Sequence, residues 1–276
     1  MIPSPLTLRR RRKPDGPRRG ATLTRLLAMA LSAGVWGAVG FGASGGWASP
    51  FQPLIPLADP AGQRLLMGAA DRSDYGPLAQ WFETQANLAY CGVASAVMVL
   101  NSLAVPAPPV PDFGAYRFWT QTNAFSIPGS RGFVRPEVVA REGMTLAQLH
   151  GWLSNRTDLV VERFHGDQLS LAQWRALLRR SLRDPRDRLL VNYQRSALGQ
   201  EGEGHISPLG AYDPASDRVL ILDVARYRHP ALWVSAAALW QAMRTTDAGA
   251  GRSRGLLLIR PSSPSPPPTA SSPSSG

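Results

Sequence analysis

Apolar residues recur at helical spacing in the first half of the chain. From Val93 to Ala104 they fall every three or four positions with little polar sequence between them, which predicts a buried helix over residues 91–104. Thr145 and Ser170 each open an amphipathic stretch with a hydroxyl that can cap the first free amides of a helix. Three further helices are predicted, over residues 145–155, 170–184 and 231–243.

Apolar runs bounded by turn residues dominate the second half. They predict four strands, over residues 187–195, 205–213, 217–227 and 255–260. The segment DPASD at residues 213–217 is rich in turn-forming residues, so the second and third strands should pair as an antiparallel hairpin. Helices followed by a meandering sheet indicate an α+β fold.

An aspartate interrupts the strand predicted over residues 217–227. Asp223 has apolar neighbours on both faces of that strand, where a carboxylate is costly unless it is paired and hydrogen-bonded. His205 and Asp223 each lie nine positions from Pro214, so closing the hairpin about this proline places them opposite each other. The carboxylate would fix the tautomer of His205 and favour the imidazolium. These two residues alone are compatible with a structural pair as well as with a catalytic one.

Cys91, the single cysteine of the chain, stands at the start of the buried helix. The free amides and the positive end of the helix dipole lower the pKa of a thiol at such a position. Gln85, six positions earlier, can donate to an oxyanion formed where Cys91 attacks, together with the backbone amide of Cys91. A lone cysteine is usually an inert core residue. Glutamine, cysteine, and then a distant histidine and carboxylate follow the order of a papain-like catalytic site.

Three long segments make the chain similar to a known family. In order, they are QANLAYCGVASAVMVLNSLAV, GHISPLGAYD and LILDVARYRHPALWVSAAALWQAM. They resemble the phytochelatin synthase family of papain-like γ-glutamylcysteinyltransferases, and the similarity extends over about residues 75–260. The resemblance implies a papain-like α+β fold, in which a helical part carrying the nucleophile packs against an antiparallel sheet, and glutathione as the substrate.

The resemblance also implies roles for individual residues. By position, the nucleophile is Cys91, the general acid and base is His205, its orienting carboxylate is Asp223, and an oxyanion donor is Gln85. The implied reaction is attack on the cysteinyl carbonyl of glutathione with release of glycine. The γ-glutamylcysteinyl group then passes from the thioester to water or to a second glutathione.

Other positions correspond to substrate-binding residues of the family. The family holds the α-amino and α-carboxylate groups of the γ-glutamyl moiety with an acid and an arginine, which by position are Asp247 and Arg254. A carboxylate with a guanidinium is the pair that a zwitterion needs. Gly204, in the GHISP segment, and Arg226, in the DVAR motif, are grouped with them. Whether Arg226 contacts substrate or only supports the DVAR aspartate is left open.

Eukaryotic members have a further cysteine-rich region, whereas this chain ends in a Pro/Ser-rich tail at residues 261–276. The resemblance is therefore to the short bacterial form, which implies glycine release more strongly than phytochelatin synthesis. Cadmium or zinc would act as glutathione thiolate complexes, because soft ions favour thiolates. We expect no metal site or cofactor in the protein itself, since His150, His165 and His229 lack ligand spacing.

Two other functions are open on the sequence alone. One is a papain-like peptidase or amidase with another substrate, which would keep the catalytic residues but show no preference for a γ-glutamyl head. The other is a non-catalytic protein that binds glutathione or metal thiolates. Such a binder has no need of an oxyanion donor opposite a nucleophile. Neither the oligomeric state nor the ratio of hydrolysis to transfer follows from the sequence.

Charge and the N-terminal segment bear on where the protein acts. Of the net charge of +11, +7 comes from residues 1–48, and the remaining +4 is too small to predict a nucleic-acid partner. A basic stretch, an apolar stretch over residues 26–43 and small residues before Ala48 have the order of a secretory signal, with an uncleaved anchor as the alternative. We expect an exported protein, periplasmic or otherwise extracytoplasmic, that contacts the membrane only through this signal. Residues 49–74 form a lead-in to the catalytic domain at residues 75–260.

Overall fold

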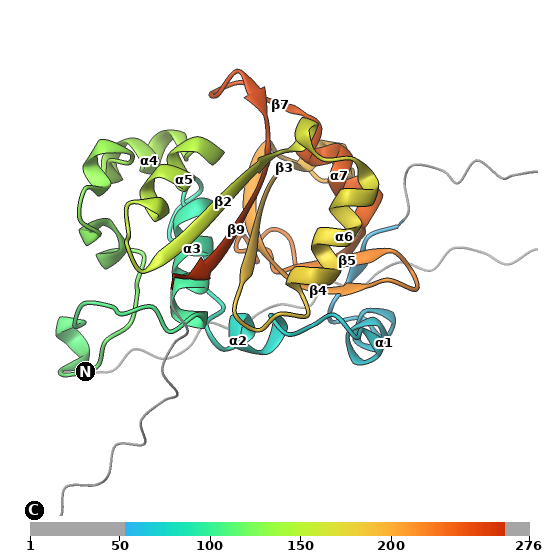
Figure 1. Ribbon diagram of the computed structural model, residues 1–276, viewed down its shortest axis with the longest axis horizontal. Coiled ribbons are helices and arrows are strands. Elements are labelled where there is room, and N and C mark those ends of the chain that lie inside the picture. Colours follow the sequence, from blue (N-terminus) through green and yellow to red (C-terminus); the bar gives the residue numbers. More distant parts are fainter. Residues whose placement is uncertain (1–52, 263–276) are drawn as a thin grey trace, which may run out of the picture. The chain divides into compact units, whose positions relative to one another are not determined.

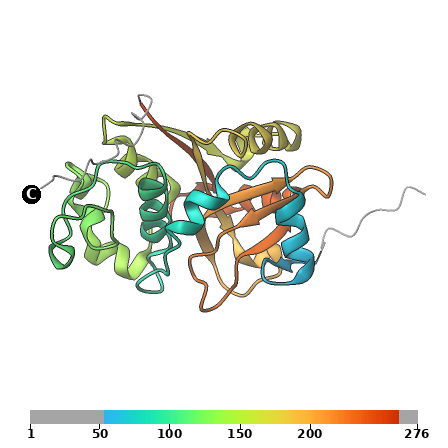
Figure 2. The same ribbon diagram turned by 90° about the horizontal axis from the view of Figure 1, so that it is seen from below.

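The computed structural model describes residues 53–262. The expected signal at residues 1–48 and the tail from residue 263 lie outside the described residues. Within the described part, no helix is long and apolar enough to cross a membrane. Seven strands form one antiparallel sheet with helices on both of its faces (Figures 1 and 2), which confirms the predicted α+β fold.

The sheet has the strand order β1-β6-β5-β4-β3-β9-β2, and every neighbouring pair is antiparallel. Its central strands, β3 and β4, are almost completely buried. A second, two-stranded sheet is formed by β7 and β8. The bounds are β1 Ile55–Pro56, β2 Leu159–His165, β3 Arg188–Gln194, β4 Gly204–Asp213, β5 Arg218–Ile221, β6 Leu232–Ser235, β7 Thr246–Asp247, β8 Arg252–Ser253 and β9 Gly255–Pro261.

Seven α-helices belong to the described part of the chain. They are α1 Pro60–Gly68, α2 Tyr75–Gln80, α3 Cys91–Ser102, α4 Pro136–Glu142, α5 Leu146–Ser154, α6 Leu171–Ser181 and α7 Ala236–Arg244. Five short 3-10 helices occur at Pro111–Phe113, Asn123–Ser126, Ser130–Gly132, Gly166–Gln168 and Arg195–Leu198.

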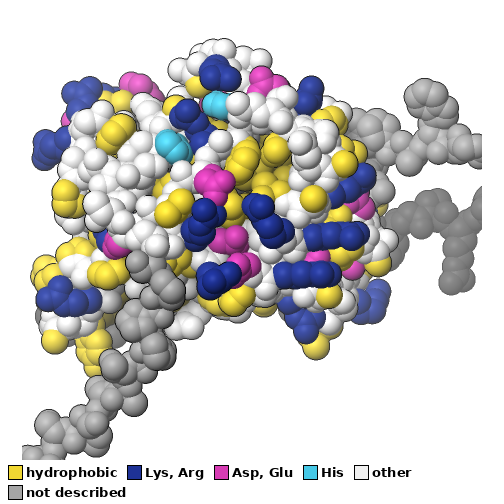
Figure 3. All heavy atoms as spheres, in the orientation of Figure 1, with side chains coloured by type: hydrophobic (Ala, Val, Ile, Leu, Met, Phe, Trp, Pro, Cys, Tyr) yellow, Lys and Arg dark blue, Asp and Glu magenta, His cyan; other side chains and the backbone are white. Residues whose placement is uncertain are grey.

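Alternate side chains of the central strands pack into two hydrophobic cores. Leu190 faces the core formed with α3 and α5, whereas Leu189 and Val191 face the core formed with α6 and α7. α3 is buried over nearly its whole surface. The amphipathic α6 instead turns Arg179 and Arg180 to solvent. On the face seen in Figure 3, basic and acidic side chains are interspersed, so this face is not a uniformly charged surface.

Three of the four predicted helices form close to their expected limits. α3 begins at Cys91, and α5 and α6 follow Thr145 and Ser170, each within a capping box. The fourth prediction is wrong in its first half, because Leu232–Ser235 form β6 and the helix starts only at Ala236. The sequence LWVS is compatible with either structure, and pairing of β6 with β5 and β1 decides between them.

All four predicted strands form, but the third is shorter than expected. β4 and β5 pair around the predicted turn, with a register shift between Leu209 and Ala211. β5 ends at Ile221, and the amide of Leu222 donates one last bond to the carbonyl of Pro208. The chain then leaves the sheet, so the backbone of the following residues is free to turn.

Several elements were not predicted, among them β1, β2, α1, α2, α4, β7 and β8. β2 pairs with β9 at one edge of the sheet, and β1 pairs with β6 at the other. α1 inserts Leu66 into the core on the α3 side. Residues 55–68 of the lead-in are therefore packed on the same sheet as the residues that follow.

Candidate active site

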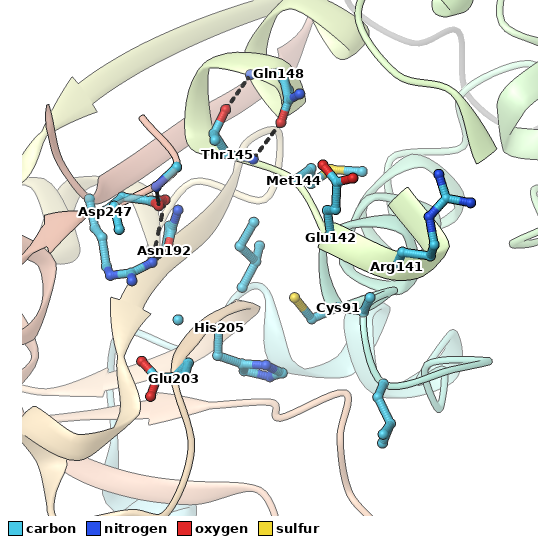
Figure 4. Close-up of a pocket in the computed structure, with 18 of the residues that line it drawn as sticks. Cys91, Arg141, Glu142, Met144, Thr145, Gln148, Asn192, Glu203, His205 and Asp247 are labelled. Carbon is cyan, nitrogen blue, oxygen red and sulfur yellow. Dashed lines mark hydrogen bonds and ion pairs between the residues drawn. The ribbon is translucent and has the colours of Figure 1, made fainter. Parts of the chain in front are cut away.

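Cys91 is the first residue of α3, and its position follows from how that helix packs on β4. Ser95, one turn later, donates a hydrogen bond of 3.0 Å from Oγ to the carbonyl of Ile206. A Cβ at Gly92 would require the Met144 side chain to move and would lie 3.4 Å from Cδ1 of Ile206 in β4. The small residues at the start of α3 let it approach the strand closely and bring the thiol beside His205 in β4 (Figure 4).

His205 lies between Cys91 and Asp223. Its backbone pairs with Tyr193 in β3, and the two rings meet edge to face with their centres 5.8 Å apart. Nε2 of His205 lies 2.9 Å from Oδ1 of Asp223, close enough for an ion pair although the N–H does not point along a hydrogen-bond direction. The structure thus brings together the three residues that the sequence analysis proposed as nucleophile, base and carboxylate.

The contact between His205 and Asp223 is not made by strand pairing. Asp223 lies beyond the end of β5, where its own carboxylate accepts a 2.8 Å hydrogen bond from the amide of Ala225. The predicted pairing partner is therefore right, but the predicted register is not, because β5 ends before Asp223 and the register has shifted upstream. The turn after the strand carries the carboxylate across to the imidazole.

A buried arginine holds the carboxylate from the other side. Nη1 of Arg195 lies 2.8 Å from Oδ2 of Asp223, and Nη2 donates to Oδ1 at 3.0 Å. The Tyr193 hydroxyl makes a longer bond of 3.4 Å to Oδ2. Sequence reasoning missed both residues. The sequence indicated only in general terms that a carboxylate in an apolar environment needs a cationic partner besides a histidine.

The charges of this cluster shift three pKa values in a consistent sense. Burial alone would raise the pKa of Asp223, but the neighbouring His205 imidazolium and the charge and hydrogen bond of Arg195 hold it well below its usual range. Burial alone would lower the pKa of His205, yet Asp223 and the thiolate of Cys91 raise it above its ordinary value. The two side chains therefore favour a carboxylate and an imidazolium.

The imidazolium of His205 lowers the pKa of the Cys91 thiol. Burial by itself raises the pKa of Cys91, while the hydrogen bond and charge of His205, and the backbone amides of Ile206 and Gly92, lower it below the value of a free thiol. A thiolate stabilised in this way is the reactive form of cysteine. The arrangement can therefore deliver a nucleophile and, from the same imidazolium, a proton for a leaving group.

Gln85 lies on the loop that leads into α3, tied down by its backbone amide, which donates to the carbonyl of Val224 at 3.0 Å. Its side-chain Nε2 donates to the carbonyl of Asn87 at 2.7 Å and to the hydroxyl of Tyr227 at 3.2 Å. Oε1 is buried without a hydrogen-bond partner among the described residues. Both N–H groups are thus occupied, and an oxyanion would have to take the place of the exposed Tyr227.

Arg226 faces the same loop. Its Nε donates to the hydroxyl of Thr84, and its guanidinium lies over the ring of Phe82 at 5.1 Å from the ring centre. It is not among the residues that line the cavity around Cys91. These contacts hold Arg226 against the loop that carries Gln85, and no hydrogen bond or ion pair with Asp223 is present among the described residues.

Cys91 and His205 line a cavity of about 520 Å³. Its walls come from the end of α4, the α4–α5 loop, β3, β4 and the turn between β7 and β8. Figure 4 shows Asp247 and Asn192 on one side of Cys91 and Arg141 on the other, with Glu142 between them.

Arg254 is held in place at the Asp247 end by three acceptors. Nη1 lies 3.4 Å from Oδ2 of Asp247 and 3.2 Å from Oδ1 of Asn192, and Nη2 donates to Oε1 of Gln194 at 2.9 Å. Nε is buried without a partner among residues 53–262. Gly204 lies under the guanidinium, where a Cβ would collide with it. The absence of a side chain at Gly204 therefore leaves space for the guanidinium of Arg254. Asn192 and Gln194, which accept its hydrogen bonds, are site residues that the sequence analysis missed.

The described residues contain no group of three or more histidine, cysteine, aspartate or glutamate side chains arranged to hold a metal ion. A ring nitrogen of each remaining histidine lies near a backbone carbonyl. The pairs are His150 with Val161, His165 with Ser253, and His229 with Glu201.

Comparison with known proteins identifies the family of the chain. The phytochelatin synthase family matches residues 49–256. Glutathione gamma-glutamylcysteinyltransferase 1 of Triticum aestivum is 35% identical over 222 residues, which is 78% of this chain and 43% of that protein. The enzyme named glutathione gamma-glutamylcysteinyltransferase 3 of Lotus japonicus is 32% identical over 76% of this chain and 43% of its own length.

A relative of lower identity is a fungal enzyme of the same name. Glutathione gamma-glutamylcysteinyltransferase of Schizosaccharomyces pombe is 29% identical over 68% of this chain and 44% of its own length. The chain spans less than half the length of these curated relatives. A match of the family over residues 49–256, together with identities above 30%, shows that the chain belongs to the phytochelatin synthase family.

Proposed function

We propose that this protein is a glutathione γ-glutamylcysteinyltransferase that works through a thioester on Cys91. The observation that carries the proposal is the thiol at the start of α3 paired with an imidazole that Asp223 holds in the charged form, while Arg195 pairs with the Asp223 carboxylate. The relatives named for this activity support the choice of glutathione as substrate.

In the first half-reaction, the Cys91 thiolate attacks the cysteinyl carbonyl and a carbon–sulfur bond forms. The negative charge that develops on the carbonyl oxygen is stabilised by the backbone amide of Cys91 and by Gln85 once its amide has exchanged the Tyr227 hydroxyl for this oxygen. The carbon–nitrogen bond then breaks as His205 gives its proton to the departing glycine nitrogen. Glycine leaves, and the γ-glutamylcysteinyl group remains as a thioester.

In the second half-reaction, His205 takes a proton from the incoming nucleophile, and the carbon–sulfur bond breaks to restore the thiolate. Water yields γ-glutamylcysteine, and the α-amino group of a second glutathione yields the first phytochelatin. The zwitterionic γ-glutamyl head fits the end of the cavity where Asp247 and Arg254 lie, because one can pair with an ammonium and the other with a carboxylate.

Cadmium and zinc enter this scheme as part of the substrate. A soft ion binds the thiolates of glutathione readily, so the metal complex is proposed as a form in which the second glutathione is presented. No step requires the ion to bind the protein.

The test is mass spectrometry of the purified protein incubated with glutathione, with and without cadmium, and with Cys91→Ala as the control. We expect free glycine, γ-glutamylcysteine and an adduct on the intact wild-type protein that is missing from the variant. A wild-type protein that releases no glycine in either condition would refute the glutathione assignment. A second substrate, α-glutamylcysteinylglycine, separates the transferase from a general peptidase, because only a peptidase would cleave it as well.

A further inference from the structure

A second arginine lines the cavity on the side of Cys91 away from Asp247 (Figure 4). We infer that Arg141 binds the carboxylate attached to the α-carbon of the reacting nitrogen, first on the leaving glycine and then on the acceptor. The inference rests on the proposed function and adds a carboxylate subsite to it.

The position of Arg141 follows from the direction of the α4–α5 loop along the cavity. Gly143 lies against the segment before the nucleophile, since a Cβ there would be 3.5 Å from the carbonyl oxygen of Ala89. Thr145 lies at the other end of this loop, next to the β7–β8 turn: a Cβ added to Gly249 in that turn would be 3.6 Å from Cγ2 of Thr145. Arg141 precedes Gly143 and therefore lies on the nucleophile's side, away from the turn.

The guanidinium of Arg141 is not paired with an acidic side chain of the described residues, so it can bind an anionic ligand. The side chain of Arg141 is exposed and forms no ion pair or hydrogen bond with any residue between 53 and 262, its neighbour Glu142 included. Arg254, the other arginine of the cavity, is 8% exposed and already donates to three protein acceptors. The chain's single lysine, Lys13, lies outside the described residues.

The ends of glutathione match these two arginines. Its γ-glutamyl carboxylate and its glycine carboxylate lie on opposite sides of the bond that breaks. When the γ-glutamyl head lies beside Asp247 and Arg254 and the cysteinyl carbonyl meets Cys91, the glycine extends toward the end of α4. Arg141 is the cation of the described cavity that the glycine carboxylate meets there.

The acceptor has the same chemistry as the leaving group. Glycine departs as an amine with a carboxylate on the adjacent carbon, and the α-amino group of a second glutathione also has a carboxylate on the adjacent carbon. Leaving and attacking nitrogens occupy the same position relative to the thioester, so one guanidinium can hold both carboxylates. Water has no such group. Arg141 should therefore favour transfer over hydrolysis.

The first test compares glutathione with γ-glutamylcysteinylglycinamide, in which the glycine carboxylate is an uncharged amide. The proteins are wild type, Arg141→Gln and the control Arg135→Gln, an exposed arginine at the start of the same helix that does not line the cavity. For wild type and the control, we expect kcat/KM for amine release to be about tenfold higher with glutathione, as one charged hydrogen bond would give. Arg141→Gln should lose this preference by slowing only with glutathione.

The second test measures the products of the acyl enzyme. At equal turnover, Arg141→Gln should give a several-fold lower ratio of transfer product to γ-glutamylcysteine than wild type and Arg135→Gln. Equal use of the two peptides by wild type, or an equal loss on both in Arg141→Gln, would overturn the inference and leave the proposed function intact. A wild type that forms no acyl enzyme would refute the proposed function, and the inference with it.

Discussion

Removing Arg195 should destabilise the fold as well as the site, because its ion pair with Asp223 is fully buried. The two side chains are 4% and 1% exposed, and the guanidinium reaches both carboxylate oxygens. Breaking a buried pair by removing one partner typically costs about 3–5 kcal/mol. His205 and the amide of Ala225 still contact the carboxylate, so we expect Arg195→Met to lose about 3 kcal/mol at pH 7.

A loss of this size is measurable without abolishing folding. Domains of this length are stable by about 5–15 kcal/mol, so most of the variant stays folded at 25 °C. At about 2–4 °C per kcal/mol, its Tm should fall by about 6–12 °C. Urea unfolding of wild type, Arg195→Met, Asp223→Asn and the double variant measures the coupling between the two side chains. The double variant should be more stable than Arg195→Met, because no unpaired charge is left behind.

The pH dependence gives a further check. The pKa of Asp223 is depressed in the folded protein, so its contribution to stability is present above the unfolded pKa of about 3.9 and is lost as pH falls toward the folded value. The deficit of Arg195→Met should therefore be full at pH 7 and should shrink as pH falls below about 4. A deficit under about 1 kcal/mol at pH 7, or single losses that simply add in the double variant, would refute this account of the pair.

Three other variants test the remaining parts of the site. Cys91 should react with iodoacetamide at pH values below the ordinary thiol pKa of about 8.5, and Asp223→Asn should move the rise in rate to higher pH; an unchanged profile would contradict the proposed ion pair. Gly204→Ala should raise KM for glutathione with little effect on kcat, because the added methyl displaces the guanidinium of Arg254; steady-state kinetics would show the opposite if Gly204 served the chemical step. Gln85→Ala should lower kcat by about 10²-fold with KM nearly unchanged, and equal kcat values would remove Gln85 from the oxyanion site.

Local sequence determined the elements whose stabilising interactions are local. The predicted α5 and α6 form as expected because Thr145 and Ser170 satisfy free amides within the same turn. The contact between His205 and Asp223 could also be predicted from the sequence, because a short turn between two strands allows few pairings of the residues on either side of it. The family, and with it the roles proposed for Cys91 and Gln85, followed from long motifs.

Tertiary structure decided everything that depends on contacts between distant segments. The helical periodicity of residues 231–243 is real, but β6 forms at its start because a strand partner is present on either side. Arg195 could not be assigned to Asp223, since that contact needs β5 to end early and the chain to turn back toward β3. Arg141 could not be assigned to the cavity from the sequence either, because a charged residue at the end of a helix is common. Its place in the cavity depends on the packing of the end of α4 against the segment before Cys91. Periodicity reports which residues share a face of one element, whereas the direction of a polar side chain depends on register, bulges and packing between elements.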